Sequence, residues 1–315
     1  MKPVFADPKA DVIFKKIFGE QAHKDLLIAL LDSLLELDAA HRIVDIEYLS
    51  PEQLPHHPKL KLSILDVRCT DARGTRYVVE MQVIEVEGFE KRVVYNACKA
   101  YTTQLAVGQD YPALNDVIAV TICDFQLWRE DEGRPGVPML SHWHMAETHS
   151  GATGLPQVQY VFLELPKYRG GDDPQTTVDK WAYFFRETRY LQRVPDALAQ
   201  GPYAAALEVA RVANLTEAEG TEYEREKMAV QDFRGGLSLA EKRGREEGRE
   251  EGREEGREEG RRVGIEEGRR DAVRDLCEVL GLVLTSAQEA ELTRLDLDGL
   301  GRLREHLKRA RAWPV

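Results

Sequence analysis

The chain has 315 residues, 43% of them hydrophobic, which is enough to bury the core of one large domain or two modest ones. Its net charge of −12 argues against a protein that coats nucleic acid, although an enzyme with acidic metal ligands remains compatible with it. The apolar runs are too short to span a bilayer, the first residues lack a signal core and the four cysteines show no CxxC spacing, so we expect a soluble, cytoplasmic protein without a disulfide framework.

The N-terminal part alternates between helical and strand periodicity. Residues 11–18 have the apolar spacing of a helix, and Gly19 fits its C-terminal stop. A second helix is predicted from Leu26 to Leu35. The following segments are predicted in chain order: strands at 43–49, 60–70 and 75–83, a helix at 90–105, strands at 116–125 and 157–163, and helices near 177–191 and 203–215.

From Gly244 to Gly268 a glycine recurs every four residues, mostly with Arg-Glu-Glu between. This low-complexity repeat has no apolar face to bury, and each glycine in a helix costs roughly 1 kcal/mol relative to alanine. We expect residues 236–270 to be a solvated spacer, helical or fluctuating. The alternative is that the glycine stripe lets two such helices approach, so that residues 241–270 form a homo-oligomer.

Residues 271–280 and 295–310 have the spacing of two short amphipathic helices. Their predicted core consists of Leu276, Val279, Leu280, Leu284, Leu292, Leu295, Leu303 and Leu307. The second of these helices is basic, as expected equally for a solvated helix end and for a phosphate contact. The predicted organisation is therefore a domain at 1–235, the repeat at 236–270 and a helical region at 271–315.

Two carboxylates face each other in the predicted hairpin. If its loop is 72–74, Asp66 pairs with Glu80 at a Cβ separation of about 5 Å, and Gln82 shares their face. Like charges on a largely apolar face need compensation, and Mg²⁺ typically takes one or two carboxylates plus waters and phosphate oxygens. Without a metal, a raised carboxylate pKa or an ion pair with Arg68 would have to compensate the charges. A loop one residue shorter would shift the register and place the two carboxylates on opposite faces.

Asp66 followed by Glu80-Met81-Gln82 resembles the PD-(D/E)xK nuclease superfamily. More narrowly, the order and spacing of several segments resemble the recombination-promoting nuclease/transposase (Rpn) family; these segments are 11–19, 64–68, 77–82, 92–97, 101–104, 108–111 and 117–125. The resemblance covers residues 5–130 by motif and extends to about 235. It implies an α/β fold with a restriction-endonuclease-like core, ordered α-β-β-β-α-β in a mixed sheet.

The resemblance implies a metal-dependent DNA endonuclease that uses Mg²⁺ or Mn²⁺ and is linked to DNA recombination and mobile elements. Asp66 and Glu80 would hold the metal. Gln82 stands where the superfamily usually has lysine, so another cation would have to stabilise the transition state. The candidates for that cation are Lys15, Arg68 and Arg92. Asp11 is either a third carboxylate or a helix-start residue, and Tyr101 and Gln104 are further candidates on the helix after the hairpin.

Two other hypotheses remain open from the residues. In the first, the fold is a degenerate nuclease that binds DNA or a partner, as Gln82 and the acidic total suggest. In the second, the glycine repeat is the functional part and the chain is an oligomerising adaptor. A zinc site made by His142, His144 and His149 with Glu147 is weakly indicated, because surface histidines explain this pattern as well.

Overall fold

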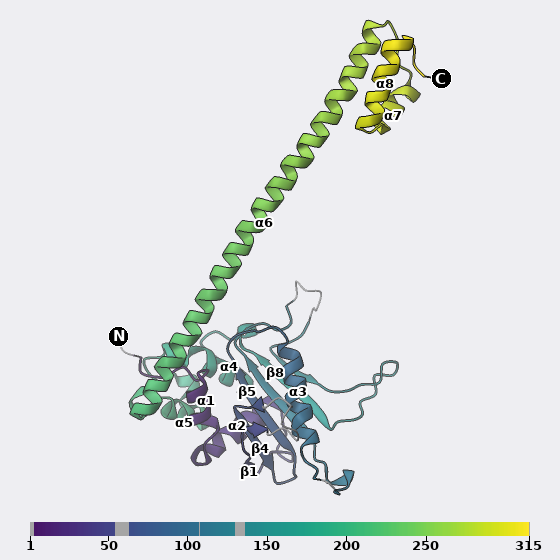
Figure 1. Cartoon of the computed structure of the whole chain (residues 1–315). Helices are drawn as coiled ribbons and strands as arrows, with labels where there is room; N and C mark the ends of the chain where they lie inside the picture. Colours follow the sequence, from purple (N-terminus) through teal and green to yellow (C-terminus); the bar gives the residue numbers. More distant parts are fainter. Residues whose placement is uncertain (1–2, 54–62, 107, 130–135, 315) are drawn as a thin grey trace. The chain divides into compact units, whose positions relative to one another are not determined.

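The computed structural model describes residues 3–53, 63–106, 108–129 and 136–314, and it divides into two compact units, residues 1–230 and 231–315. The first unit contains a six-stranded sheet with helices on both faces (Figure 1). Its strands are β1 (Ile46–Tyr48), β4 (Val67–Asp71), β5 (Arg76–Gln82), β6 (Val117–Cys123), β7 (Leu140–Trp143) and β8 (Val158–Glu164). A separate two-stranded ribbon pairs β2 (Glu52–Gln53) with β3 (Ser63–Ile64).

The sheet is mixed, with strand order β1-β4-β5-β6-β8-β7. The first three strands form an antiparallel meander, β6 and β8 continue in parallel with β5, and β7 closes the sheet as an antiparallel edge strand. This arrangement agrees with the predicted α-β-β-β-α-β core, since α1 (Asp11–Phe18) precedes the meander and α3 (Phe89–Thr102) connects β5 to β6.

Helices cover the two faces of the sheet unequally. The larger core lies under α1, α2 (Lys24–Leu34), α4 (Thr177–Glu187) and α5 (Gly201–Val209). The smaller core lies under α3. Side chains alternate between the faces along β5, so Val79 joins the larger core and Val78 the smaller one. By the same alternation, Glu80 and Gln82 lie on the face that α3 covers.

The hairpin between β4 and β5 has the predicted register. Val67 pairs with Val79 and Arg68 with Val78, which places Asp66, one residue before β4, opposite Glu80. The loop is the expected 72–74: the N–H of Asp71 donates to Thr75 O at 3.0 Å, and Gly74 takes a left-handed φ of 89°. The hairpin prediction is therefore confirmed.

Gly19 ends the first helix for a different reason than expected. Its φ is −104°, which any residue can adopt, so no left-handed stop is formed there. Its N–H instead donates to Lys15 O at 2.7 Å, and a Cβ at this position would lie 2.7 Å from the same oxygen. The close backbone approach, not the backbone angle, explains the glycine.

Several elements differ from the prediction. The strand predicted at 60–70 joins the sheet only from Val67 onward, and residues 60–62 lie outside the described part of the chain. The edge strand β7 was not predicted. Short 3₁₀ turns occur at Gln21–His23, Tyr111–Ala113, Leu165–Lys167, Thr188–Tyr190, Asp196–Leu198 and Val212–Asn214.

The second unit contains most of α6 (Glu217–Val279), together with α7 (Ser286–Arg294) and α8 (Leu297–Ala310). The glycine repeat is helical throughout and exposed. The core of this unit comprises Val273, Cys277, Leu292, Leu300, Leu303 and Leu307. Val279 is 82% exposed, so its assignment to that core was wrong; it is the last residue of α6 and faces solvent. No helix in the described ranges is long and apolar enough to cross a membrane.

Candidate functional site

Asp66 and Glu80 are held by different neighbours at the carboxyl end of β5. Asp66 is half-buried, and its Oδ2 accepts the backbone N–H of Met81 at 2.7 Å. Glu80 is 8% exposed, and its Oε1 accepts a hydrogen bond from Asn96 Nδ2 at 2.9 Å. The hairpin thus supplies the two carboxylates, and α3 supplies the side chain that orients the second one.

Burial makes both carboxylates hard to ionise. Burial, together with the charges of Asp11 and Glu80, raises the pKa of Asp66 to about 7, against the opposing effects of the Met81 N–H and Lys15. Burial also raises the pKa of Glu80, while the charge of Arg92 and the hydrogen bond from Asn96 lower it. A cation between the carboxylates would favour their ionised forms.

Gln82 is fixed at both ends of its amide. Its Nε2 donates to Ile84 O at 2.7 Å, and its Oε1 accepts from Arg92 Nη2. The guanidinium carbon of Arg92 lies 5.3 Å from the centre of the Phe89 ring. Arg92 Nε is buried and has no hydrogen-bond partner among the described residues. A positive charge from α3 therefore lies beside the side chain that replaces the expected lysine.

The other predicted cations are placed differently. Arg68 is buried, and its Nη1 donates to Ser50 O at 2.7 Å, so its guanidinium is engaged by the backbone rather than by Asp66. Lys15 forms an ion pair with Asp11 at 2.7 Å, one turn earlier on α1. Asp11 is the first residue of that helix, and the charges of Asp11 and Lys15 both act on the pKa of Asp66. Asp11 thus begins the helix and also interacts electrostatically with Asp66.

Gln104 lies away from the carboxylates. It follows the end of α3, where its Nε2 donates to Asn115 O at 2.8 Å and its Oε1 accepts the Asn115 N–H at 2.9 Å. Because α3 returns the chain from the carboxyl end of β5 to the amino end of the parallel β6, its last turn lies at the wrong end of the sheet. Tyr101, in that last turn, packs against the core under α3.

Two contacts at this site have little signal in the sequence. Asn96 lies one helical turn after Arg92, on the α3 face that meets the sheet, and the i, i+4 spacing could have indicated it. Glu226 accepts the N–H groups of Asp11 and Val12, at 2.5 Å and 3.4 Å, from more than two hundred residues away. No local pattern predicts a contact of that separation.

The donors present fit a divalent cation with few protein ligands. No group of three or more metal-binding side chains is found among the described residues. Two buried or half-buried carboxylates, with waters and phosphate oxygens completing the shell, are what Mg²⁺ commonly accepts. Asp66 and Glu80 would be its protein ligands.

Further polar contacts lie beside the carboxyl ends of the parallel strands β5, β6 and β8. Gln82 pairs with Cys123 of β6, and the next residue, Asp124, donates its N–H to Gln82 O at 2.9 Å. The carboxylate of Asp124 forms an ion pair with the buried Lys9 at 3.1 Å. Arg189, from the turn after α4, forms an ion pair at 3.2 Å with Asp7, two residues before Lys9.

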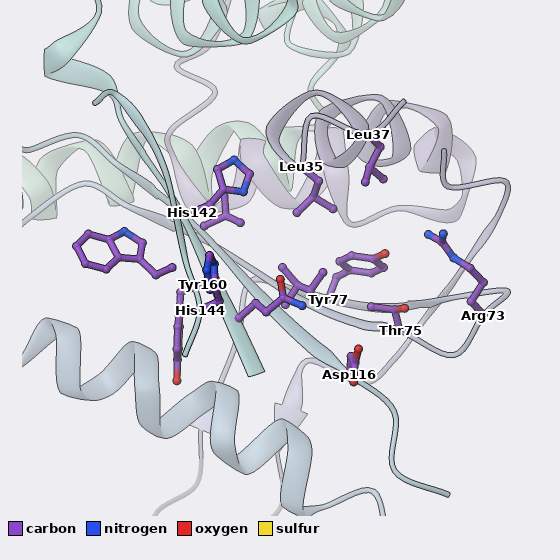
Figure 2. Close-up of a pocket in the computed structure, with 13 residues that line it drawn as sticks. Leu35, Leu37, Arg73, Thr75, Tyr77, Asp116, His142, His144 and Tyr160 are labelled. Atoms are coloured by element: carbon purple, nitrogen blue, oxygen red, sulfur yellow. The ribbon is translucent and has the colours of Figure 1, made fainter. Parts of the chain in front are cut away.

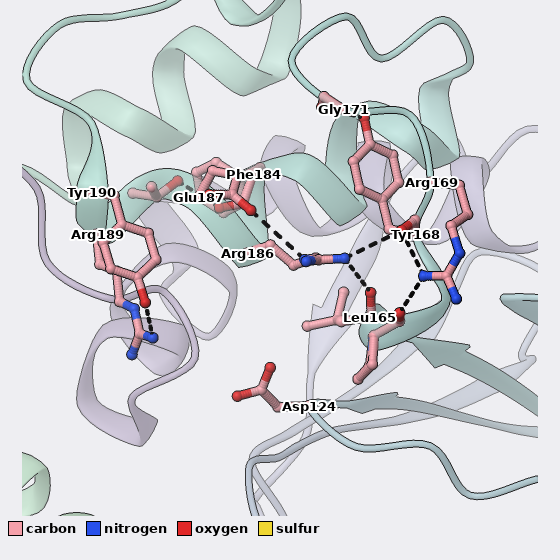
Figure 3. A network of polar contacts seen from close by, with 12 residues as sticks. Asp124, Leu165, Tyr168, Arg169, Gly171, Phe184, Arg186, Glu187, Arg189 and Tyr190 are labelled. Atoms are coloured by element: carbon pink, nitrogen blue, oxygen red, sulfur yellow. Dashed lines mark hydrogen bonds and ion pairs between the residues drawn. The ribbon is translucent and has the colours of Figure 1, made fainter. Parts of the chain in front are cut away.

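Figure 3 shows arginines gathered at the far part of this edge. Arg186 Nη1 points at the end of β8 and donates to the carbonyls of Leu165 and Tyr168, at 3.2 Å and 3.3 Å. Arg169 donates to the Tyr168 carbonyl as well. The edge that bears the carboxylates is thus also lined by cations.

A pocket of about 300 Å³ lies at the opposite ends of the same strands (Figure 2). Its lining includes Thr75, Tyr77, Asp116, His142 and His144. None of the paired carboxylates lines it, so it is separate from the site on the hairpin. His149 pairs with Glu147 at 2.8 Å instead of joining the other histidines, which leaves the zinc hypothesis without support from the described residues.

The model of a family described as PD-(D/E)XK nuclease family transposase matches residues 8–240. Neither the curated proteins nor the solved structures contain a significant match to the chain.

Proposed function

Because the chain belongs to the PD-(D/E)XK nuclease family of transposases, we propose that it is a Mg²⁺-dependent DNA endonuclease that hydrolyses phosphodiester bonds. The family match confirms the resemblance predicted from the motifs. The observation that most supports the proposal is the hairpin register, which sets Asp66 opposite Glu80. A role in DNA recombination or mobile elements is part of this proposal.

In the proposed mechanism, Asp66 and Glu80 would hold the metal. A bound divalent ion polarises the scissile phosphate and lowers the pKa of the attacking water. The Met81 N–H fixes the Asp66 carboxylate, and Asn96 fixes that of Glu80, so neither side chain needs to reorganise during the reaction.

Arg92 takes the part that lysine usually has in this superfamily. Gln82 adds no charge, but its Oε1 holds the guanidinium of Arg92, whose charge acts on Glu80. A fixed guanidinium at this position would stabilise the charge that develops on the phosphate. We propose Arg92 over Lys15 and Arg68 because Lys15 is paired with Asp11 and Arg68 with the Ser50 carbonyl. Asp11 and Lys15 act as accessory groups through their charges on Asp66.

The proposal is tested with supercoiled plasmid DNA and the purified full chain. We expect nicking or linearisation with Mg²⁺ or Mn²⁺, none with excess EDTA, and a loss of at least about a thousandfold in Asp66→Ala and Glu80→Ala, since the metal and its water are lost with either carboxylate. Glu85→Gln is the matched control, because Glu85 is a nearby carboxylate that pairs with the exposed Arg129.

Undiminished cleavage by both alanine variants would refute the site assignment. If the wild-type chain fails to cleave DNA with every divalent metal tested, the degenerate-nuclease alternative is supported. A gel-shift measurement on the same plasmid would then show whether DNA binding remains.

A further inference from the structure

The helix that contains the glycine repeat begins inside the first unit and packs against α1. Three of its early residues, Glu219, Tyr223 and Glu226, are spaced at i, i+4 and i+7, so they share one helical face. All three contact the segment from Asp7 to Lys16. This contact lies entirely within residues 1–230.

Glu226 supplies the cap that α1 lacks. The residue before this helix is Ala10, which has no side-chain acceptor for the free N–H groups of the first turn. The two carboxylate oxygens of Glu226 accept the N–H groups of Asp11 and Val12 instead. The negative charge also lies at the positive end of the helix dipole.

Tyr223 and Glu219 extend the contact along α1 in both directions. The buried Tyr223 accepts the Asp7 N–H at its hydroxyl, at 2.9 Å. Glu219 forms an ion pair with Lys16, at 2.6 Å, near the other end of α1. Since Glu219 contacts the end of α1 and Glu226 its start, the two helices run antiparallel.

Ile13 and Phe14 of α1 belong to the same core cluster as Val67 and Met81, the residues that follow Asp66 and Glu80, so the start of α1 lies at the candidate site. Asp11 and Lys15, which form an ion pair one turn apart, both act electrostatically on Asp66. Glu226 interacts with the same two charges. A shift of this turn would therefore change the charges that surround Asp66.

We propose that Glu226, supported by Tyr223, is a positioning residue of the active site: it holds the first turn of α1 so that Asp11 and Lys15 stay beside Asp66. This inference rests on the proposed nuclease function. It makes the beginning of α6 a working part of the catalytic unit, although the family motifs lie far upstream of it. Glu226 acts through α1 and contacts neither metal nor DNA.

The test uses Glu226→Ala, Glu226→Gln and Tyr223→Phe in the full chain, with Glu224→Gln as control. Glu224 is exposed on the same helix and pairs with Lys227, so it does not reach α1. We expect Glu226→Ala to lower kcat for plasmid cleavage roughly tenfold to a hundredfold with KM nearly unchanged, because misplaced groups impair chemistry more than binding. Glu226→Gln keeps one acceptor oxygen and should recover most of the rate.

Two further readouts do not depend on cleavage. Hydrogen exchange of the Asp11 and Val12 amides should accelerate in Glu226→Ala but not in Glu224→Gln. Binding of Mn²⁺ alone, measured by calorimetry, should weaken severalfold in Glu226→Ala.

The outcomes separate the two proposals. Unchanged amide exchange in Glu226→Ala would overturn the capping contact, and faster exchange with unchanged kcat would overturn the positioning role. A wild-type chain without nuclease activity would refute the proposed function. In that case Mn²⁺ affinity decides the inference: weaker binding by Glu226→Ala supports it, and equal binding refutes it.

Discussion

At the scale of single residues, the site combines two carboxyl groups that ionise less readily than usual with one cation, Arg92, whose position is fixed by a hydrogen bond. Asp66 and Glu80 both have raised pKa values because they are withdrawn from water. The charge of Arg92 opposes part of the effect of burial on the pKa of Glu80, and Arg92 is itself held by the Gln82 amide. In the proposed mechanism, the positive charge that a lysine on β5 would supply comes instead from Arg92 on α3.

Arg92 gives the first prediction. Arg92→Gln should lower the rate of plasmid cleavage about a hundredfold, since one preorganised donor at a developing charge is removed. The double variant Gln82→Lys with Arg92→Gln restores a cation on β5 and should regain at least about tenfold of that loss. Single-turnover kinetics with Arg225→Gln as control measures both effects. A double variant no faster than Arg92→Gln would contradict this placement of the charge.

Asp66 gives a prediction about stability and pH. Its pKa is raised from an ordinary value of 3.8 to about 7 in the folded chain, so the folded state holds the proton more tightly than the unfolded state. Stability from this group is complete below pH 4 and is lost as the pH rises through 7. Without metal, Asp66→Asn should therefore be more stable than wild type by about 4 kcal/mol at pH 8, and nearly equal to it at pH 4.

Urea denaturation at the two pH values measures this difference. Equal stabilisation at both would show that the substitution acts through packing and not through the charge of Asp66.

At the scale of elements, the hairpin loop determines whether the two carboxylates meet. Gly74 has φ near 89°, and a Cβ there would lie 2.9 Å from Asn115 Cγ. Gly74→Ala should cost about 2 to 3 kcal/mol of unfolding free energy, and Gly108→Ala only about 1 kcal/mol, because Gly108 has a similar φ but open space around it. Thermal unfolding of both variants compares them. Equal losses would mean that the contact with Asn115 is unimportant.

The sequence predicted those elements whose signal is local. The turn at 71–74 and the strands beside it predicted the pairing of Asp66 with Glu80, because side-chain alternation and loop length together determine register. The family resemblance, and not the spacing, made Arg92 a candidate cation. The sequence predicted the fold class as well, since helix and strand periodicities occur in the order of the family core.

The features that the sequence did not predict depend on how distant segments of the chain come together in the fold. Gln104 was a candidate because it follows α3 closely, but α3 crosses back over the sheet and delivers it to the amino end of β6. Glu226 had no local signal, since its partner lies at the start of the chain. The short edge strand β7 has half-exposed positions and no clear alternation, so periodicity could not identify it.

At the scale of the whole molecule, the repeat is the part least connected to the proposed chemistry. All the residues of the candidate site lie within residues 1–230, whereas the glycine repeat is an exposed part of α6 in the second unit. A Cβ added at any of its glycines, from Gly244 to Gly268, would meet nothing within 4 Å. Packing among the described residues therefore does not require these glycines, and both hypotheses for the repeat, spacer and self-pairing element, remain proposals.

Deletion of residues 241–270 separates these two hypotheses. We expect cleavage per chain to stay within about twofold of wild type, because the positioning contacts of α6 end at Glu226. Light scattering then reports how many chains each particle contains. A change from oligomer to monomer supports pairing through the repeat, and an unchanged number of chains supports the spacer. Loss of cleavage by a folded deletion variant would contradict the assignment of catalysis to the first unit.

The central claim is that Asp66 and Glu80 together hold one divalent metal. Calorimetric titration of the metal-free full chain with Mn²⁺ tests it most directly, using Asp66→Asn, Glu80→Gln and the control Glu85→Gln. We expect one Mn²⁺ per chain in the wild type and in the control, and at least a tenfold loss of affinity in each of the other two variants. Mn²⁺ binding of wild-type strength and stoichiometry in Asp66→Asn and Glu80→Gln would contradict this claim.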